Sequence, residues 1–248
     1  MLVYDSHAHL KHGDAAATEY GPDAIVEAMD AAGIEKSVVF AMSTSTDRSV
    51  EMARAAVEAF PGRLVPYVYA LPAYGKAVLP AIRRAVTELG FRGIKLHAAE
   101  CRLTEYVVDP VFSLAGQLGV PCLVDFSGDL AAAKRLATAF PYTSIIVAHL
   151  GQYLCTVPER LDGFIELAEA CDNVCLDASG VALVWKIEDA VRRVGSDRVL
   201  FGTDGPHPAP DTASFARREV RKFEVLNLTA AQKEDVFAGT LRRLAKIE

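Results

Sequence analysis

Short apolar runs alternate with amphipathic segments along the chain, and this alternation restricts the fold more than any other feature of the sequence. The apolar runs predict strands at residues 2–4, 36–41, 64–71, 93–97, 121–126, 144–149, 173–178 and 198–203. Helices are expected between them at 22–32, 47–60, 74–89, 110–118, 130–140, 158–170 and 184–194, and afterwards at 212–226 and 230–247. Because runs rich in Val, Ile and Leu are typical of strands buried on both faces, the sheet should be parallel.

Repeated strand–helix units in a chain of 248 residues predict an α/β fold, a single (β/α)8 TIM barrel that forms one domain over residues 1–248. The active site of such a barrel lies at the C-terminal ends of its strands. An open, doubly wound sheet is the alternative. That fold usually carries a glycine-rich phosphate-binding turn after its first strand, and the segment DSHAHL is not such a turn.

Composition narrows the class of function. Hydrophobic residues make up 51% of the chain, enough for a large core, and the net charge of -6 argues against a nucleic-acid-binding surface. No apolar run reaches the roughly 18 residues that cross a bilayer, and the N-terminus has no signal-peptide pattern. The 5 cysteines lack a CxxC pair, which fits reduced thiols. We therefore expect a cytoplasmic protein that binds a small-molecule substrate, with a homodimer as the default assembly and without a membrane or nucleic-acid partner.

Polar side chains gather at the predicted C-terminal ends of the strands, where a barrel places its chemistry. All six histidines of the chain lie at these ends or in the loops just after them. His12, in the polar stretch KHGD, is expected at the surface rather than at a site. The residues at the strand ends are Asp5, His7, His9, Lys95, His97, Asp125, Ser127, His149, Asp177, Asp204 and His207.

The pair His7 and His9 indicates a metal site. In extended backbone, residues two apart point to the same side, so both imidazoles can reach one divalent ion. A nitrogen from His149 and a carboxylate oxygen from Asp204 would complete the site and leave a position open for water. Neutral imidazole favours zinc, with manganese as the alternative. Read singly, His149 also fits a hydrogen-bonded core histidine, and Asp204 in GTDGP also fits a turn.

An ordered set of segments resembles the amidohydrolase superfamily, in particular the branch called amidohydrolase-2. The segments are YDSHAHL, FRGIKLH, PCLVDFSGD, IIVAHLGQ, NVCLDASG, RVLFGTDGP and AGTLRRLAKI. The resemblance implies a barrel with one or two divalent metals held by His7, His9 and Asp204, and with His149 as a ligand or an acid/base residue. It also implies hydrolysis of amides, lactones or esters, or non-oxidative decarboxylation. Lys95 is similar in place to the carbamylated, metal-bridging lysine of dihydroorotase.

Strand five departs from the family's pattern, in which a histidine commonly ends a Pro-Val-x-x-His segment. Here Asp125 stands at that position. Its carboxylate could bind the ion and favour manganese, or a shift of one residue could turn it out of the barrel. The expected ligands are His7, His9, Asp125, His149 and Asp204, the expected catalytic residues are Asp204 and His149, and the candidates for substrate binding are Lys95, His97, Arg102, Tyr153 and His207.

Three functions fit the sequence. The first is hydrolysis of a small amide, lactone or ester by water activated on one divalent ion, with a second ion left open. The second is non-oxidative decarboxylation of an unsaturated or aromatic carboxylic acid. The third is a barrel that has lost its metal through the change to Asp125 and that binds a ligand or follows another chemistry. Carbon dioxide release separates the first two, and metal analysis tests the third.

Overall fold

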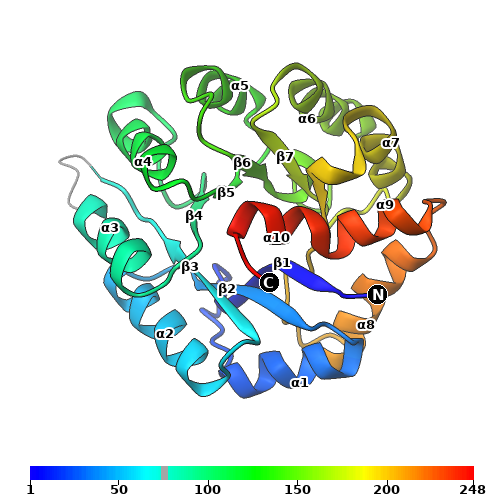
Figure 1. The fold of residues 1–248 in the computed structure, drawn as a ribbon, viewed down its shortest axis with the longest axis horizontal. Helices are drawn as coiled ribbons and strands as arrows, with labels where there is room; N and C mark the ends of the chain where they lie inside the picture. The colour runs from blue at the N-terminus through cyan, green and yellow to red at the C-terminus, as the bar shows by residue number, and fades with distance from the viewer. Residues whose placement is uncertain (74–77) are drawn as a thin grey trace.

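The strands are parallel and pair in chain order from β1 to β8, with the helices around the outside (Figure 1). The computed structural model describes residues 1–73 and 78–248. The strands are β1 (Tyr4–Lys11), β2 (Lys36–Ala41), β3 (Leu64–Tyr69), β4 (Gly93–His97), β5 (Cys122–Asp125), β6 (Ile145–Val147), β7 (Val174–Asp177) and β8 (Val199–Leu200).

Backbone hydrogen bonds close the sheet where the chain beyond β8 meets β1. The Ser6 N–H donates to the Phe201 carbonyl over 3.0 Å, the Asp204 N–H to the His7 carbonyl over 2.8 Å, and the His9 N–H to the Gly205 carbonyl over 2.7 Å. The predicted (β/α)8 TIM barrel is thereby confirmed. The closure also brings His7 and Asp204, at opposite ends of the sequence, to one place.

The helices follow the predicted alternation, with changes at their ends. They are α1 (Pro22–Ala32), α2 (Thr46–Ala59), α3 (Val78–Glu88), α4 (Glu105–Leu118), α5 (Leu130–Ala139), α6 (Pro158–Ala170), α7 (Trp185–Val194), α8 (Thr212–Glu224), α9 (Ala230–Glu234) and α10 (Thr240–Ala245). Helix α4 starts before Pro110, which the sequence had placed at its first turn. Of the predicted helix at 74–89, residues 74–77 lie outside the described residues. No helix in the described part of the chain is long and apolar enough to span a membrane.

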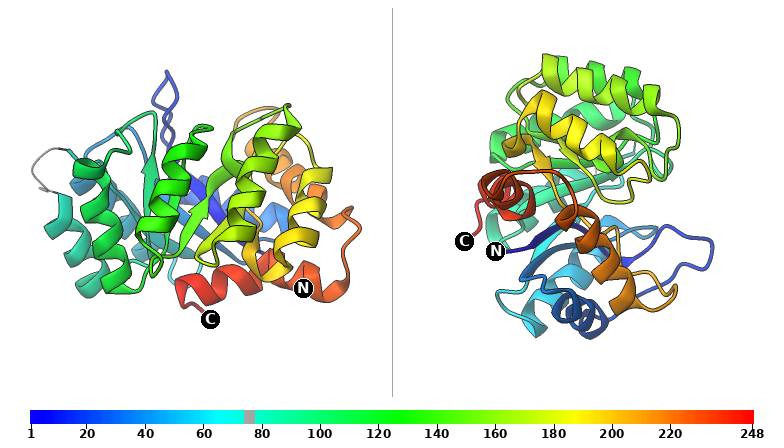
Figure 2. Two further views of the ribbon diagram at one scale, coloured as in Figure 1. Left: turned by 90° about the horizontal axis from the view of Figure 1, so that it is seen from above. Right: turned by 90° about the vertical axis from the view of Figure 1, so that its right-hand side faces the viewer.

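Two apolar layers hold the barrel together. Side chains on the outward face of the strands pack against the helices, and a second cluster, which includes Tyr4, Phe40, Tyr67 and Leu123, fills the interior. Leu241 and other residues of α10 belong to the interior cluster. Helix α10 lies across the end of the barrel where both termini lie, while the dark-blue loop after β1 stands out from the opposite end (Figures 1 and 2). One end of the barrel is therefore closed by packing, and the other end is open.

Strand β1 is longer than predicted and carries a bulge. Its predicted extent, residues 2–4, was wrong because the polar run after Tyr4 interrupts the apolar pattern. Asp5 pairs with Ser37 and Ala8 with Val39, so β1 uses one residue more than β2 over this stretch. A bulge of this kind shifts the side-chain alternation locally. Asp5 consequently shares the outward side with Ser37, while His7 lies on the inner side.

Candidate metal centre

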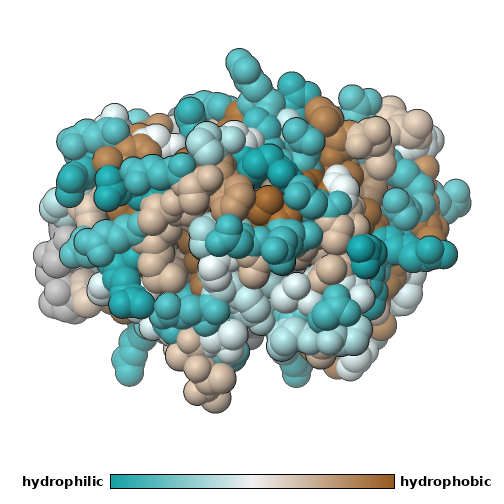
Figure 3. All heavy atoms as spheres, turned by 90° about the horizontal axis from the view of Figure 1, so that it is seen from below, coloured by the Kyte–Doolittle hydropathy of each residue, from teal (hydrophilic) through white to brown (hydrophobic). Residues whose placement is uncertain are grey.

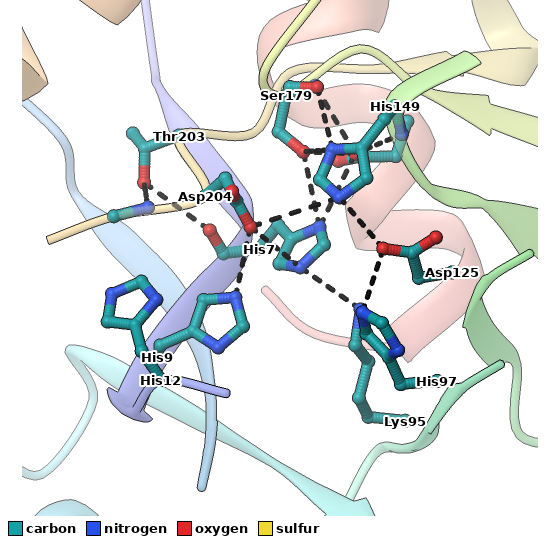
Figure 4. A network of polar contacts seen from close by, with 12 residues as sticks. His7, His9, His12, Lys95, His97, Asp125, His149, Ser179, Thr203 and Asp204 are labelled. Carbon is teal, nitrogen blue, oxygen red and sulfur yellow. Dashed lines mark hydrogen bonds and ion pairs between the residues drawn. The ribbon is translucent and has the colours of Figure 1, made fainter. Parts of the chain in front are cut away.

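The open end of the barrel holds a cavity of about 270 Å³ that is lined mainly by polar and ionisable residues. Every residue that lines this cavity, except Gly13, Met42 and Ser127, was predicted as a metal ligand or a substrate contact, and Figure 4 shows most of them converging. The lining residues are His7, His9, Gly13, Met42, Lys95, His97, Asp125, Ser127, His149, Tyr153 and Asp204.

His7, His149 and Asp204 form the one group among the described residues whose donor atoms could hold a metal ion. One ligand atom from each lies within 4.8 Å of the others, and all three residues are buried. Asp204 Oδ1 is 3.2 Å from His7 Nε2 and 4.0 Å from His149 Nε2. Two imidazole nitrogens and a carboxylate oxygen are a donor set that zinc and related divalent ions accept.

Two of these residues have left-handed backbone, with φ of 60° at both His149 and Asp204. That region is uncommon for residues other than glycine and tends to occur at functional sites. The Asp204 N–H is held by the His7 carbonyl at 2.8 Å, and the His149 N–H donates to Asp177 Oδ1 at 3.3 Å. Neighbouring strands therefore hold both sharp turns in place.

His9 touches the cluster through Asp204. Its Nε2 lies 3.0 Å from Asp204 Oδ1, and its buried Nδ1 has no hydrogen-bond partner among the described residues. His12 stacks on the His9 ring with centroids 4.3 Å apart, and its Nε2 donates to the Pro206 carbonyl over 2.8 Å. The expectation that His12 lies at the surface was wrong, because the loop after β1 folds back along the strand.

Asp125 points into the barrel, so the shift that would turn it outward did not occur. Its Oδ2 lies 3.0 Å from His97 Nε2 and 3.5 Å from His149 Nε2. The Ala99 N–H donates to His97 Nδ1, which places the His97 proton on Nε2, toward Asp125. Asp125 thus joins the two histidines at the edge of the three-residue cluster (Figure 4).

Lys95 is fully buried beside His7. Its Nζ is 3.1 Å from His7 Nε2 and 5.1 Å from the centre of the Phe40 ring. Burial lowers the pKa of Lys95, although carboxylates including Asp125 act in the opposite direction. The side chain therefore brings a primary amine directly to the predicted metal ligands.

The two histidines of the cluster titrate differently. Burial, reinforced by the Lys95 ammonium, lowers the pKa of His7 to about 4. Burial alone would also lower the pKa of His149, but the Asp204 and Asp125 carboxylates outweigh it and raise that pKa to about 9. Without a metal, His149 is therefore charged at neutral pH and His7 is neutral.

Of the other residues predicted to bind the substrate, Tyr153 lies at the cavity, whereas His207 and Arg102 lie outside its wall. The Tyr153 ring packs edge-on against His149 with centroids 5.1 Å apart and lines the cavity. His207 Nε2 is 3.9 Å from Asp204 Oδ2, too far for a hydrogen bond, and the ring packs against His12 outside the cavity wall. Arg102 is exposed, and the structure does not bring it to the cavity.

Two buried carboxylates behind the site, Asp5 and Asp177, support it through hydrogen bonds that the sequence did not predict. Asp5 accepts hydrogen bonds from the N–H groups of His7 and Thr203, both at 2.9 Å, and from the Thr203 hydroxyl at 2.6 Å. Burial raises the pKa of Asp5 to about 7 despite these donors. Asp177, at the end of β7, lies against His7 and Ser179. Both aspartates had been noted as strand-end residues, but no pattern marked Ser179 or Thr203.

Solved structures with the same fold include proteins of several activities. A TIM-barrel protein from Bordetella bronchiseptica is 17% identical with a TM-score of 0.78, covering 98% of each chain. A 4-oxalomesaconate hydratase from Rhodopseudomonas palustris is 17% identical, with a TM-score of 0.72, covering 99% of this chain and 96% of its own. A 5-carboxyvanillate decarboxylase from Novosphingobium aromaticivorans, solved with manganese, is 18% identical, with a TM-score of 0.76, covering 99% and 95%. These likenesses show the common fold.

Sequence comparison identifies the family. No protein with curated annotation matches the chain significantly. The family model described as amidohydrolase, by contrast, matches residues 4–245, from the first residue of β1 to the last residue of α10. This match covers nearly the whole chain, and the chain therefore belongs to the amidohydrolase-2 branch of the amidohydrolase superfamily.

Proposed function

We propose that the chain is a metal-dependent hydrolase of a small amide, lactone or ester. The observation that carries the proposal is the buried convergence of His7, His149 and Asp204 at the base of the cavity. The cavity volume of about 270 Å³ fits a small substrate rather than a polymer. Membership of the amidohydrolase family agrees with this class of chemistry.

The donor set fits a divalent ion. His7, His149 and Asp204 would hold it, with His9 and Asp125 as further ligands at either edge of the cluster. Imidazole donors favour zinc, and the carboxylate of Asp125 would make manganese acceptable. Two decarboxylases of the same fold were solved with manganese. We infer one ion, because one group of donors converges among the described residues.

The residues around the cluster suit hydrolysis. A bound divalent ion would polarise a carbonyl group and lower the pKa of water. We assign Asp204 as the base for the attacking water because its carboxylate lies in the cluster at the cavity. It is ionised, since His149, His207 and His9 outweigh burial and hold its pKa well below the usual range. His149 has one of two roles: it binds the ion through Nε2, or, if it stays off the ion, it orients the substrate or donates a proton to the leaving group. Lys95, His97 and Tyr153 line the wall where the rest of the substrate would bind.

Decarboxylation is the second candidate, and the charges on one wall favour it. The Lys95 amine and the protonated His149 both face the cavity, so a substrate carboxylate would meet two cationic groups. If His149 stays off the ion, it could also protonate the carbon that loses carbon dioxide. Several structures of the same fold are decarboxylases of aromatic acids. The two candidates differ in product: decarboxylation releases carbon dioxide, and hydrolysis releases none.

The proposal is tested first by metal content. The purified protein, produced with zinc and manganese supplied, should hold about one equivalent of metal. The double variant His7→Ala, His9→Ala should lose it, while Asp172→Asn, which changes a fully exposed carboxylate on the same barrel, should not. Less than about a tenth of an equivalent in the parent protein, with no activity after reconstitution, would refute the metalloenzyme and leave a metal-free barrel. Full metal content in the double variant would refute the ligand assignment.

A substrate panel then separates the two chemistries. The metal-loaded protein should hydrolyse members of a panel of small amides, lactones and esters, and loss of metal to a chelator should abolish that activity. Carbon dioxide released from unsaturated or phenolic acids, without hydrolysis of the panel, would replace the first candidate by the second. Asp204→Asn should remove activity in either case, because it removes the proposed base and a ligand.

A further inference from the structure

The end of β7 lies directly behind the two histidines of the cluster. Asp177 is completely buried and its carboxylate accepts hydrogen bonds from four groups: the Ser6 hydroxyl at 2.5 Å, the Ser179 hydroxyl, the Ser179 N–H at 3.2 Å and the His149 N–H at 3.3 Å. An N–H group can only donate, so Asp177 Oδ1 must act as an acceptor. This carboxylate and Ser179 form what we call the β7 anchor.

The β7 anchor determines which nitrogen of His149 carries the proton. His149 Nδ1 is 2.9 Å from the Ser179 carbonyl oxygen. A carbonyl can only accept, so the hydrogen lies on Nδ1. His149 Nε2 then points away from β7, toward Asp125 and Asp204. The backbone of Ser179 thus sets the orientation of this ring whatever its side chain does.

The same reasoning applies to His7 through two side chains. Its Nδ1 is 3.2 Å from the Ser179 hydroxyl and 3.4 Å from Asp177 Oδ1. Because the Ser179 hydroxyl donates its proton to Asp177, its oxygen can offer His7 only a lone pair. On the opposite side of the ring, the Lys95 ammonium lies 3.1 Å from Nε2 and can only donate. Asp204 Oδ1 also lies 3.2 Å from Nε2 and would accept a proton there. The two acceptors at Nδ1 and the Lys95 donor at Nε2 outweigh this single carboxylate and favour the His7 proton on Nδ1.

We infer that Asp177 and Ser179 are positioning residues that fix His7 and His149 with their protons on Nδ1 and their Nε2 atoms toward the cavity. A histidine that binds a metal commonly donates its other N–H to a carboxylate or a carbonyl, which fixes its orientation and increases its basicity. The link to metal binding rests on the proposed function. The positions of the protons do not, because they follow from hydrogen bonds within the chain.

Close packing leaves the β7 anchor little room to rearrange. Gly202, just after β8, lies so near that a Cβ atom on it would come within 2.4 Å of Asp177 Oδ2 and 2.9 Å of the Ser6 hydroxyl. Every donor and acceptor of the anchor is buried. An alternative proton arrangement would therefore leave a buried polar group unpaired, which destabilises the fold.

The direct test is long-range ¹H–¹⁵N correlation NMR of the full chain labelled with ¹⁵N-histidine, without metal, near neutral pH. His7 should show a protonated Nδ1 and an unprotonated Nε2. In Ser179→Ala, His7 should become a mixture of both neutral forms, because Nδ1 keeps only the longer contact to Asp177 while Asp204 still competes for the proton at Nε2. In Asp177→Asn the amide oxygen must take the place of Oδ1 to satisfy the two backbone N–H groups, so the Nδ1 proton should stay.

Metal affinity provides the second readout, with Asp172→Asn as the matched control on the exposed surface before β7. Ser179→Ala and Asp177→Asn should each raise the Kd for Zn²⁺ and Mn²⁺ about tenfold or more, while the control leaves it unchanged. A His7 proton on Nε2 in the parent protein would overturn the inference without any variant. Unchanged proton positions and Kd in Ser179→Ala would overturn it as well. If the parent protein binds neither metal, the proposed function fails, and the NMR result still decides the role of the β7 anchor.

Discussion

Acidification should weaken metal binding because a proton and the metal compete for one nitrogen. His149 Nε2 lies between two carboxylates, and its pKa is raised to about 9. A metal ion can bind this nitrogen only after the proton leaves. Below the pKa, each pH unit therefore costs about 1.4 kcal/mol of binding free energy. His7, with a pKa of about 4, contributes no proton near neutrality.

The size of the effect follows from these two values. From about pH 8.5 to about pH 6.5, the cost rises by roughly 2.7 kcal/mol, so the Kd should increase about 100-fold. Binding should release one proton per metal over this range. Titration of the metal-free protein with Mn²⁺, followed by the electron paramagnetic resonance of free Mn²⁺, gives the Kd at each pH. Calorimetry in two buffers of different ionisation enthalpy counts the protons.

Two results would refute this reasoning. A Kd that stays constant between these pH values would mean that His149 is neutral or is not a ligand. Release of two protons would mean that a second group, such as the Lys95 ammonium, must also give up a proton. A His149→Gln variant serves as the control, because its weakened binding should no longer depend on pH over this range.

The same raised pKa has the opposite consequence for the stability of the metal-free fold. The native state holds the His149 proton more tightly than the unfolded chain does. Its contribution to the free energy of unfolding is therefore complete below about pH 6.5 and declines as the pH rises toward 9, by at most about 3 kcal/mol. Urea unfolding of the metal-free protein across this range measures it. Metal-free protein should thus lose stability as its affinity for metal increases.

Three further variants test separate parts of the site. In Asp125→Asn, the pH midpoint of metal binding should fall, because the variant lacks a carboxylate that helps His149 to retain its proton. The Kd at about pH 9.5 then tests whether Asp125 is itself a ligand. A Kd at least tenfold above the parent value would identify it as one, and an unchanged Kd would exclude it. Gly202→Ala should lower the free energy of unfolding by about 1–3 kcal/mol in urea titrations, because its Cβ would press on Asp177; an unchanged stability would contradict the close packing. Arg102→Ala should leave KM within about twofold, because the side chain is exposed away from the cavity, and a large rise in KM would place it at the substrate.

The fold could be predicted because each strand repeats one signal, a short apolar run before a helical segment. Residues 36–41 and 93–97 were predicted to the residue as β2 and β4, and the other strands after β1 to within a few residues. The extent of the first strand was predicted wrongly because its second half is polar and nonetheless buried. His7 and His9 are buried as parts of the candidate site, although they are not hydrophobic. Local apolar pattern cannot detect such a segment.

The candidate site was predictable in outline, since the topology of a barrel brings all C-terminal strand ends together. His7, His149 and Asp204 could therefore be grouped before any coordinates were known. The hydrogen bonds that support these residues could not be predicted from the sequence. The role of Ser179 depends on the direction of one carbonyl and one hydroxyl, and exposed and buried serines look alike in a sequence.

Figure 3 shows hydrophilic and hydrophobic residues interspersed over one side of the molecule. Inside the barrel, the bulge in β1 acts as a one-residue insertion: it keeps the pairing with β2 but reverses the side-chain alternation along β1. Tyr4 still packs in the interior and Ala8 in the outer layer, while the additional residue, Ser6, supplies a hydroxyl to Asp177. A reader who assumes strict alternation in the segment Asp-x-His-x-His would place Asp5 beside the two histidines. The insertion instead places Asp5 on the outer side of β1, where it accepts a hydrogen bond from the Thr203 N–H and links the first strand to the chain beyond the last. One added residue therefore separates the carboxylate that helps to close the barrel from the two histidines that face its cavity.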